Sequence, residues 1–491
     1  MKKFLLIYGL MTLFLLASCG ERMIVVEQQL NEEIVIYPDY KEVTIPSNIA
    51  PLNISLQNID NAQLIIEGEK GEGFQVQLRK GYFDIPQQKW NQLINDNKGQ
   101  KIKLTICKFV DGKWSAFTPF NIYIAQEPID KYVAYRLIPP DYELWNKMGI
   151  YQRNLENFEE SAIYENTIGD YNCANCHSFQ NGDPRHFMFH TRETYPGTLV
   201  FKDGEIEKLN TKTDETISFL VYPYWHPNGR YIVFSVNSTR QAFHANNLNR
   251  VEVYDSASDV VVYDTEMHQV ISCDLIKADS IFETFPSFSA DGKSIYFCSA
   301  KAANPMPFEY RNVHYDLCKI DFDANTGAFG DKVDTLFHAS SIGKSVSLPR
   351  ESPDGKYLTF VLHQYGNFSI WHKDADLHTI NLNTGDVFSM AEANSGDVES
   401  YHSWSRNSKW MVFSSRRDDG LYTRLYICYI DENGRAHKAF MLPQHNPKKY
   451  YQDLLLSYNI PELIDEKVNV SKSQIERMLK KEAGITITYK K

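Results

Sequence analysis

The chain has 491 residues and a net charge of −11, from 51 Lys and Arg against 62 Asp and Glu. This length exceeds what one hydrophobic core usually supports, so two or more domains are expected. The acidic balance and the lack of a basic block exclude nucleic acid as an expected partner. The 28 Phe, 30 Tyr and 7 Trp residues favour a large β-rich protein.

The N-terminus has the pattern of an export signal. Lys2 and Lys3 precede an apolar run from Phe4 to Leu16, which is too short for a membrane-spanning helix. The run ends in LASC, which resembles the lipobox of bacterial lipoproteins. That resemblance implies that residues 1–19 are a lipoprotein signal and that Cys19 carries the lipid. An ordinary signal peptide with a chance cysteine is the alternative.

Such a lipid would anchor the chain in a membrane, and no later segment is apolar enough to span one. We therefore expect a bacterial cell-envelope protein, lipid-anchored, at the outer membrane and facing the periplasm or the surface.

Residues 22–130 are predicted to form an antiparallel β-sandwich, immunoglobulin-like in outline. Short stretches such as AQLIIEG (62–68) and KIKLTICKFV (101–110) alternate apolar and polar residues between turns, and no helical period persists. This domain shows no catalytic constellation, so a spacer or docking role is expected.

Residues 131–180 are predicted to be a helical linker. From Pro139 to Asn166 charged and aromatic residues recur at roughly helical spacing. The linker ends in YNCANCHSF, in which Cys173, Cys176 and His177 form the pattern C-x-x-C-H.

Two thiols on one helical turn can reach both vinyl groups of a porphyrin, and the adjacent histidine can coordinate its iron. The pattern resembles the attachment motif of c-type cytochromes. It implies one haem c bound covalently to Cys173 and Cys176, with His177 as the proximal iron ligand. A disulfide or redox pair, a zinc site and a chance pattern are the alternatives.

The sixth iron ligand is not fixed by the motif. Met188 and His190 are expected to share one face of the following strand, because alternate residues of a strand point the same way. The candidates, in order of preference, are His190, Met188 and His226, followed by Met148 and His402. An open sixth position would permit ligand binding or peroxide chemistry.

Residues 181–443 are predicted to form one domain, because an internal repeat in which a turn precedes an apolar strand begins just before them and recurs along them. The copies are 177–190, 223–235, 286–299, 349–361 and 402–414. Repeated antiparallel units bury their faces when they stack radially. The copy PRESPDGKYLTFV resembles the repeats of TolB-like and WD-repeat-like propellers, which implies a β-propeller of five or six blades.

The remaining segments are expected to be structural. Residues 444–491 are predicted to be a helical tail, which begins at a capping box of Ser471 and Gln474, followed by a strand at 484–491. That strand either closes the ring or pairs with another sheet edge. The charged loop at 414–424 is interpreted as a brace for the last blade.

The fold class expected is therefore all-β, and three functions are considered. The preferred one is a membrane-anchored monohaem protein that transfers electrons to or from a redox or envelope protein docked on the propeller. The second is a TolB-like scaffold that binds a protein or a glycan without redox chemistry. The third is a haem peroxidase-like enzyme, for which the sequence suggests no substrate.

Overall fold

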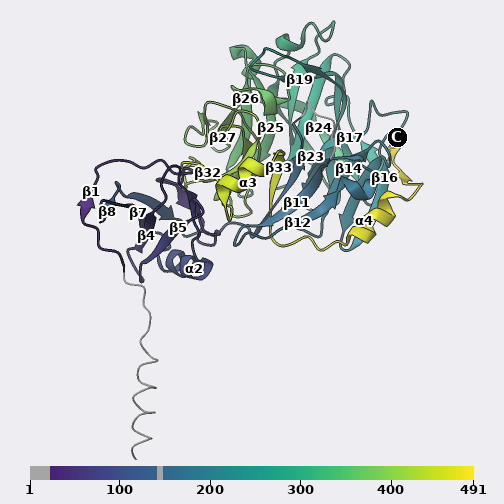
Figure 1. The fold of residues 1–491 in the computed structure, drawn as a ribbon. Helices are drawn as coiled ribbons and strands as arrows, with labels where there is room; N and C mark the ends of the chain where they lie inside the picture. Colours follow the sequence, from purple (N-terminus) through teal and green to yellow (C-terminus); the bar gives the residue numbers. More distant parts are fainter. Residues whose placement is uncertain (1–22, 141–146, 491) are drawn as a thin grey trace, which may run out of the picture.

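A computed structural model describes residues 23–140 and 147–490. The predicted export signal and Cys19 lie outside the described residues. The described chain is mostly β and forms an N-terminal β domain followed by a six-bladed β-propeller (Figure 1). None of its described helices is long and apolar enough to cross a membrane.

The N-terminal β domain contains nine strands linked by hydrogen bonds in the order β1-β8-β7-β4-β5-β6-β3, with β9 joining β2 to β7. The strands are β1 (Gln28–Gln29), β2 (Thr44–Ile45), β3 (Ile54–Ser55), β4 (Ala62–Gly68), β5 (Phe74–Arg79), β6 (Tyr82–Phe83), β7 (Lys101–Val110), β8 (Lys113–Ala116) and β9 (Phe120–Ile124). The immunoglobulin-like pairing of two sheets stays a prediction.

This domain also contains a helix, α2 (Gln87–Asp96), which was not predicted from the sequence. The helix buries Trp90, Leu93 and Ile94. Three buried residues over ten positions give only a weak helical period beside the strong alternation of the strands.

Each blade of the propeller is an antiparallel sheet of four strands, which follow one another from the axis outwards. Blades 1 to 5 follow the sequence, and blade 6 combines a strand near the C-terminus with three strands that precede blade 1. Blade 1 is β13 (Cys173–Phe179), β14 (Phe187–Arg192), β15 (Gly197–Lys202) and β16 (Glu205–Asn210), and blade 2 is β17 (Leu220–Trp225), β18 (Tyr231–Phe243), β19 (Val251–Asp264) and β20 (Gln269–Ile271). Blade 3 is β21 (Ile281–Phe288), β22 (Ser294–Lys301), β23 (Asp316–Asp323) and β24 (Ala328–Phe337), and blade 4 is β25 (Ser345–Glu351), β26 (Tyr357–His363), β27 (Asp376–Asn381) and β28 (Val387–Ser389). Blade 5 is β29 (Glu399–Trp404), β30 (Trp410–Ser415), β31 (Arg424–Tyr429) and β32 (Phe440–Met441), and blade 6 is β33 (Ser457–Ile464), β10 (Tyr132–Ile138), β11 (Gly149–Asn154) and β12 (Glu160–Glu165).

Blade 6 corrects the expectation of a helical linker. Of its four strands, β10, β11 and β12 lie where helices were predicted. The sequence of β10 does not alternate apolar and polar residues, because this strand is buried on both faces. The usual sequence pattern of a strand is therefore absent there. In β11 the polar residues Gln152 and Arg153 are buried as well. Short 3₁₀ turns connect some strands: η2 (Asn166–Gly169), η3 (Tyr310–Asn312), η4 (Ala339–Ile342) and η5 (Ser369–Trp371).

The C-terminal tail packs on the outside of the ring. It contains α3 (Pro447–Asp453), α4 (Lys472–Leu479), β34 (Ile485–Thr486) and β35 (Thr488–Tyr489). The predicted capping box at Ser471 and Gln474 is confirmed. Strands β34 and β35 pair in parallel with β16 and β20, at the outer edges of blades 1 and 2. The ring is closed by β33 instead, which pairs with β10.

The six innermost strands share one irregularity. Consecutive inner strands contact each other, and β33 contacts β13 to complete the ring. Each contains one non-glycine residue with φ between 50° and 55°, at a point where the pairing register shifts. The residues are Cys176, Tyr222, Phe285, Leu348, Tyr401 and Ile460. Such bulges redirect side chains, and five of these six residues line the propeller's axial cavity.

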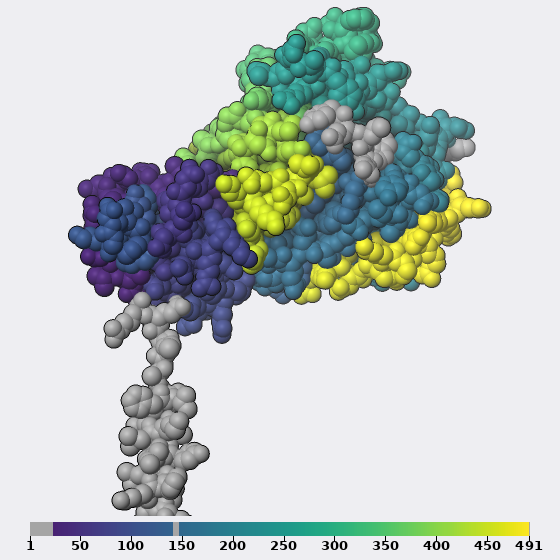
Figure 2. Space-filling view, in the orientation of Figure 1, coloured from purple at the N-terminus to yellow at the C-terminus, as the bar shows by residue number. Residues whose placement is uncertain are grey.

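The N-terminal β domain lies against blade 5, as the purple surface in Figure 2 shows. Lys438 Nζ lies 2.7 Å from Asp39 Oδ2, and Thr44 Oγ1 lies 2.8 Å from His437 Nδ1. These contacts join strand β2 and its preceding loop to the end of the propeller repeat.

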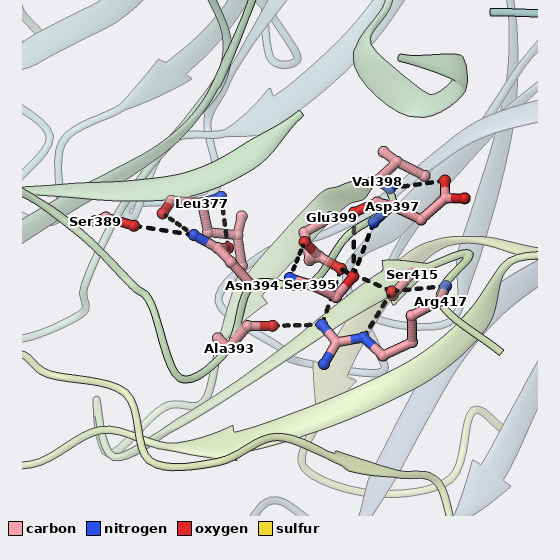
Figure 3. Close-up of polar contacts among 10 residues, drawn as sticks. All are labelled: Leu377, Ser389, Ala393, Asn394, Ser395, Asp397, Val398, Glu399, Ser415 and Arg417. Carbon is pink, nitrogen blue, oxygen red and sulfur yellow. Dashed lines mark hydrogen bonds and ion pairs between the residues drawn. The ribbon is translucent and has the colours of Figure 1, made fainter. Parts of the chain in front are cut away.

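The charged loop at 414–424 braces blade 5, as its sequence predicts. The buried Glu399 carboxylate accepts hydrogen bonds from Ser395 Oγ at 2.6 Å, Ser415 Oγ at 2.8 Å and Arg417 Nη2 at 2.9 Å (Figure 3). Arg416 donates to the Ile370 carbonyl of blade 4 at 2.5 Å. The arginines of this loop therefore join chain segments rather than leaving a free anion site.

Candidate axial cavity

A cavity of about 350 Å³ lies on the propeller axis and is lined by residues of all six inner strands and the turns that follow them. Its volume falls within the range of small-molecule sites, about 300–1,000 Å³. The lining mixes aromatic rings with titratable groups, among them Tyr222, Trp404, Arg350 and Glu351. This composition is typical of a binding site rather than a packing defect.

The C-x-x-C-H segment lies on strand β13 and not on a helix. The helical turn that was expected to present both thiols together is therefore wrong. Cys176 and His177 line the cavity, whereas Cys173 is buried outside its lining. Burial raises the pKa of the Cys173 thiol, against the influence of Arg136 and Arg192. Both thiols are free.

His177 is a buried, uncharged imidazole. Its side chain is 1 % exposed, and burial, with a smaller contribution from Arg136, lowers its pKa to about 3. Neither ring nitrogen makes a well-aligned hydrogen bond to a described residue, although the nearby Ile460 backbone acts weakly to raise the pKa. A neutral imidazole is the form that coordinates metals, and both ring nitrogens are enclosed in this arrangement.

Glu462 of β33 faces His177. Its Oε1 lies 3.6 Å from His177 Nε2, and its Oε2 accepts a hydrogen bond from the Phe179 backbone N–H at 3.0 Å. Burial raises the pKa of Glu462 to about 8, and Arg350 acts weakly in the opposite direction. The carboxyl and the imidazole are therefore both uncharged at neutral pH, and they do not form an ion pair.

The three preferred candidates for the sixth ligand lie outside the cavity lining. His190 Nδ1 bonds to Thr198 Oγ1 at 3.0 Å, and Met188 packs in the apolar cluster between blades 1 and 2. His226 Nε2 lies 2.9 Å from the Gly292 carbonyl. Met148, a lower-ranked candidate, is likewise outside the lining.

His402, the other lower-ranked candidate, does line the cavity. Its Nε2 lies 3.0 Å from the Thr359 carbonyl oxygen. Burial, and secondarily Arg350, lower its pKa to about 3. Two uncharged imidazoles therefore belong to one cavity.

The residues present fit a haem in one respect and leave one requirement unmet. Cys176 offers a thiol and His177 an unprotonated nitrogen in the same aromatic cavity, which suits covalent attachment and iron ligation. A second thioether needs Cys173 to face the cavity, which it does not do in this arrangement of β13. Over residues 23–140 and 147–490, no three His, Cys, Asp or Glu side chains gather closely enough to hold a metal ion by themselves.

Neither the family models nor the curated proteins include a match to this chain. Solved structures resemble it at low identity. The periplasmic gluconolactonase of Pseudomonas aeruginosa is 12% identical over 67% of this chain and 99% of that one, with a TM-score of 0.35. The propeller domain of the Trilobed protease from Pyrococcus furiosus is 12% identical over 71% and 96%, with a TM-score of 0.32.

A puromycin-hydrolysing peptidase of Mycobacterium tuberculosis is 11% identical over 82% of this chain and 57% of its own, with a TM-score of 0.36. At this identity the likenesses concern the fold alone and say nothing of activity. On its strand order the chain is a six-bladed β-propeller protein with an added N-terminal β domain.

Proposed function

We propose that the protein is a monohaem c-type electron carrier of the bacterial envelope, with its haem held in the axial cavity. One observation carries the proposal: His177, the histidine of C-x-x-C-H, is buried and uncharged beside the thiol-bearing Cys176 on the cavity lining. The export signal with Cys19 supports it, because haem c is attached outside the cytoplasm.

The chain's own residues would have separate tasks. His177 would ligate the iron, and Cys176, joined by Cys173 after a local change in β13, would tether the porphyrin. Rings such as Tyr222 and Trp404 would exclude water from the site. When bound, haem supplies one-electron transfer at a potential set by its ligands and burial.

The charged lining would serve the haem carboxylates. The Arg350 guanidinium lines the cavity, lies 4.8 Å from the Tyr224 ring centroid and donates a hydrogen bond to the Pro349 carbonyl at 2.7 Å. A half-buried guanidinium favours a carboxylate partner, because its charge has lost part of its hydration. The redox partner would dock on the propeller over this cavity, and lipidated Cys19 would keep the protein at its membrane.

The test is to produce the full chain in a bacterial host that matures c-type cytochromes and to measure the pyridine haemochrome spectrum and the intact mass. We expect one covalent haem plus the lipid. A Cys173→Ala/Cys176→Ala variant should lose the pigment, and Cys273→Ala, which changes a half-buried thiol outside the cavity lining, should retain it. A colourless, correctly exported wild-type protein would refute the proposal.

A second candidate function is the binding of a glycan in the same cavity. The position of Cys173 outside the lining favours it, as does the combination of Trp404 with Arg350 and Glu351, since sugars bind to aromatic faces flanked by polar groups. Calorimetric titration of a colourless protein with envelope oligosaccharides would test it. Binding that persists in the Cys173→Ala/Cys176→Ala variant and disappears in Trp404→Ala would support this function.

A further inference from the structure

One position of the inner strands recurs around the propeller axis, two residues after the residue with positive φ. At this position blades 1, 3 and 5 have serine, and blades 2, 4 and 6 have a long polar side chain. The residues, from blade 1 to blade 6, are Ser178, Tyr224, Ser287, Arg350, Ser403 and Glu462. All but Ser287 line the axial cavity. The long side chains thus come from alternate blades, with small serines between them.

The three long side chains are half-buried and meet around Arg350. The Arg350 guanidinium lies 4.8 Å from the Tyr224 ring centroid. Glu462 is near enough for the Arg350 charge to act on its pKa, against the larger effect of burial. Trp404 Nε1 donates a hydrogen bond to the Arg350 carbonyl at 3.2 Å. One guanidinium, one carboxyl and two aromatic rings therefore share this part of the cavity.

Arg350 has no counter-ion among the described residues. Its guanidinium donates to the Pro349 carbonyl at 2.7 Å and forms no ion pair with a described carboxylate. Burial raises the pKa of Glu462 to about 8, so its carboxyl is uncharged at neutral pH and cannot balance the arginine. The neighbouring Glu351 carboxylate accepts instead from the Ala290 backbone N–H at 3.0 Å. A half-buried cation of this kind favours an anionic group on a ligand.

The repeat shows that the fold does not require this arginine. The same position holds serine in three blades, so the inner strand forms without a long or charged side chain there. The other guanidinium of the lining belongs to Arg406, which is exposed and already paired with Asp465. Arg350 is therefore the described cation of the lining whose charge is left for a ligand.

We propose that the axial cavity binds an acidic sugar, whose carboxylate pairs with Arg350 and whose ring packs against the neighbouring aromatic side chains. The inference rests on the second candidate function, a glycan in this cavity, and adds the charge of its ligand. A carboxylate matches the planar fork of a guanidinium. Uncharged polar side chains of the lining, such as Ser403, are suited to sugar hydroxyls.

The first measurement uses the colourless full chain and the methyl glycosides of glucuronic and galacturonic acid. Each is compared by ligand-observed NMR titration with its neutral counterpart, the methyl glycoside of glucose or galactose. We expect the acids to bind about tenfold to hundredfold more tightly, because hydrogen bonds to charged groups are the stronger ones. Equal or tighter binding of the neutral sugars would overturn the inference and leave the second candidate function standing. Absence of binding by all four would refute that function itself.

The second measurement compares variants. Arg350→Gln should bind the acids no more tightly than the neutral sugars, whereas Arg350→Lys keeps the charge and should retain part of the preference. Arg185→Gln changes an exposed arginine outside the lining, paired with Asp183, and should match the wild type. A preference for acids that persists in Arg350→Gln, or an equal loss of affinity for acidic and neutral sugars, would overturn the inference. If Arg350→Gln does not fold, Arg350→Lys and the wild-type comparison decide.

Discussion

The Tyr365 hydroxyl donates a hydrogen bond to Glu252 Oε1 at 2.6 Å, and this contact joins two blades that are not neighbours. Glu252 lies on β19 of blade 2, and Tyr365 follows β26 of blade 4. Asn367 Nδ2 makes a similar bond to Asp255 Oδ2 at 2.6 Å. The β18–β19 hairpin, whose strands have 13 and 14 residues, thus reaches past blade 3 and is held there by buried carboxylates.

Removal of the Tyr365 hydroxyl is expected to destabilise the propeller. Tyr365→Phe takes one donor from a carboxylate that is almost fully buried, and an unsatisfied buried group costs about 1–3 kcal/mol. Urea denaturation should show that decrease in the free energy of unfolding. The control is Tyr123→Phe, which removes an exposed hydroxyl that bonds Glu42 at 3.0 Å. Equal effects in the two variants would contradict the bracing role of Tyr365.

The Glu399 site in blade 5 gives a second prediction. Arg417→Ala leaves the buried Glu399 carboxylate with its donors from Ser395 and Ser415 and no cation, and breaking a buried ion pair costs about 3–5 kcal/mol. Lys332→Ala breaks a pair of exposed side chains, Lys332 with Asp334, and should cost under about 1 kcal/mol. Thermal and urea unfolding of both variants measure the contrast. A loss in Arg417→Ala as small as in Lys332→Ala would contradict it.

Glu283 predicts a pH dependence of stability. Burial, with a smaller effect of Asp259, raises its pKa from 4.5 to about 8. Between these values the folded state binds more protons than the unfolded state, so stability falls as the pH rises. The slope is at most about 1.4 kcal/mol for each pH unit.

The free energy of unfolding of Glu283→Gln should therefore fall less than that of the wild type between about pH 5 and pH 8. Glu205→Gln, at an exposed position of β16, is the control and should follow the wild type. Parallel curves for the wild type and Glu283→Gln would show that Glu283 titrates normally.

The C-terminal strands give a fourth prediction. Ile487 lies between β34 and β35, is 1 % exposed, and packs with Trp225 and Val270 in one apolar cluster. Ile487→Ala should cost about 2–5 kcal/mol, as is usual for large-to-small changes in a core. Ile342→Ala, at an exposed isoleucine, should change stability by less than about 0.5 kcal/mol. Differential scanning calorimetry of both variants measures these stability losses. A loss in Ile487→Ala as small as in Ile342→Ala would show that the tail is not part of the propeller fold.

Five blades could be predicted because each carries the same turn and strand in one stretch of sequence. The sequence allowed a sixth blade but did not identify its strands, because they come from two distant segments. In β33 the sequence Ile460-Pro461 does repeat the inner-strand pattern of Tyr222-Pro223. Two residues are too short a signal without the turn that follows the inner strands of blades 1 to 5. Strand β33 has no such turn, because the chain leaves the blade after it and continues to α4.

The cavity could be predicted only in part. Cys176 and His177 were identified as site residues from their spacing, but the local pattern of the motif does not distinguish a helical turn from a bulged strand. Glu462 and His402 lie far along the chain, and only ring closure brings them to the same cavity as His177. His402, a lower-ranked candidate from the sequence, stands where four blades have proline, and that difference is its signal. Glu462 has no such signal, because the equivalent residue differs from blade to blade.

Closure of the ring by β33 has a consequence for biogenesis. Strand β10 meets its inner partner only after almost the whole polypeptide has been synthesised, and such distant pairing is slow. Until then the edge of β10 that β33 covers lacks a neighbour, and exposed edges favour aggregation. A nascent chain that stops before Ser457 is therefore expected to yield insoluble protein rather than a smaller, working propeller.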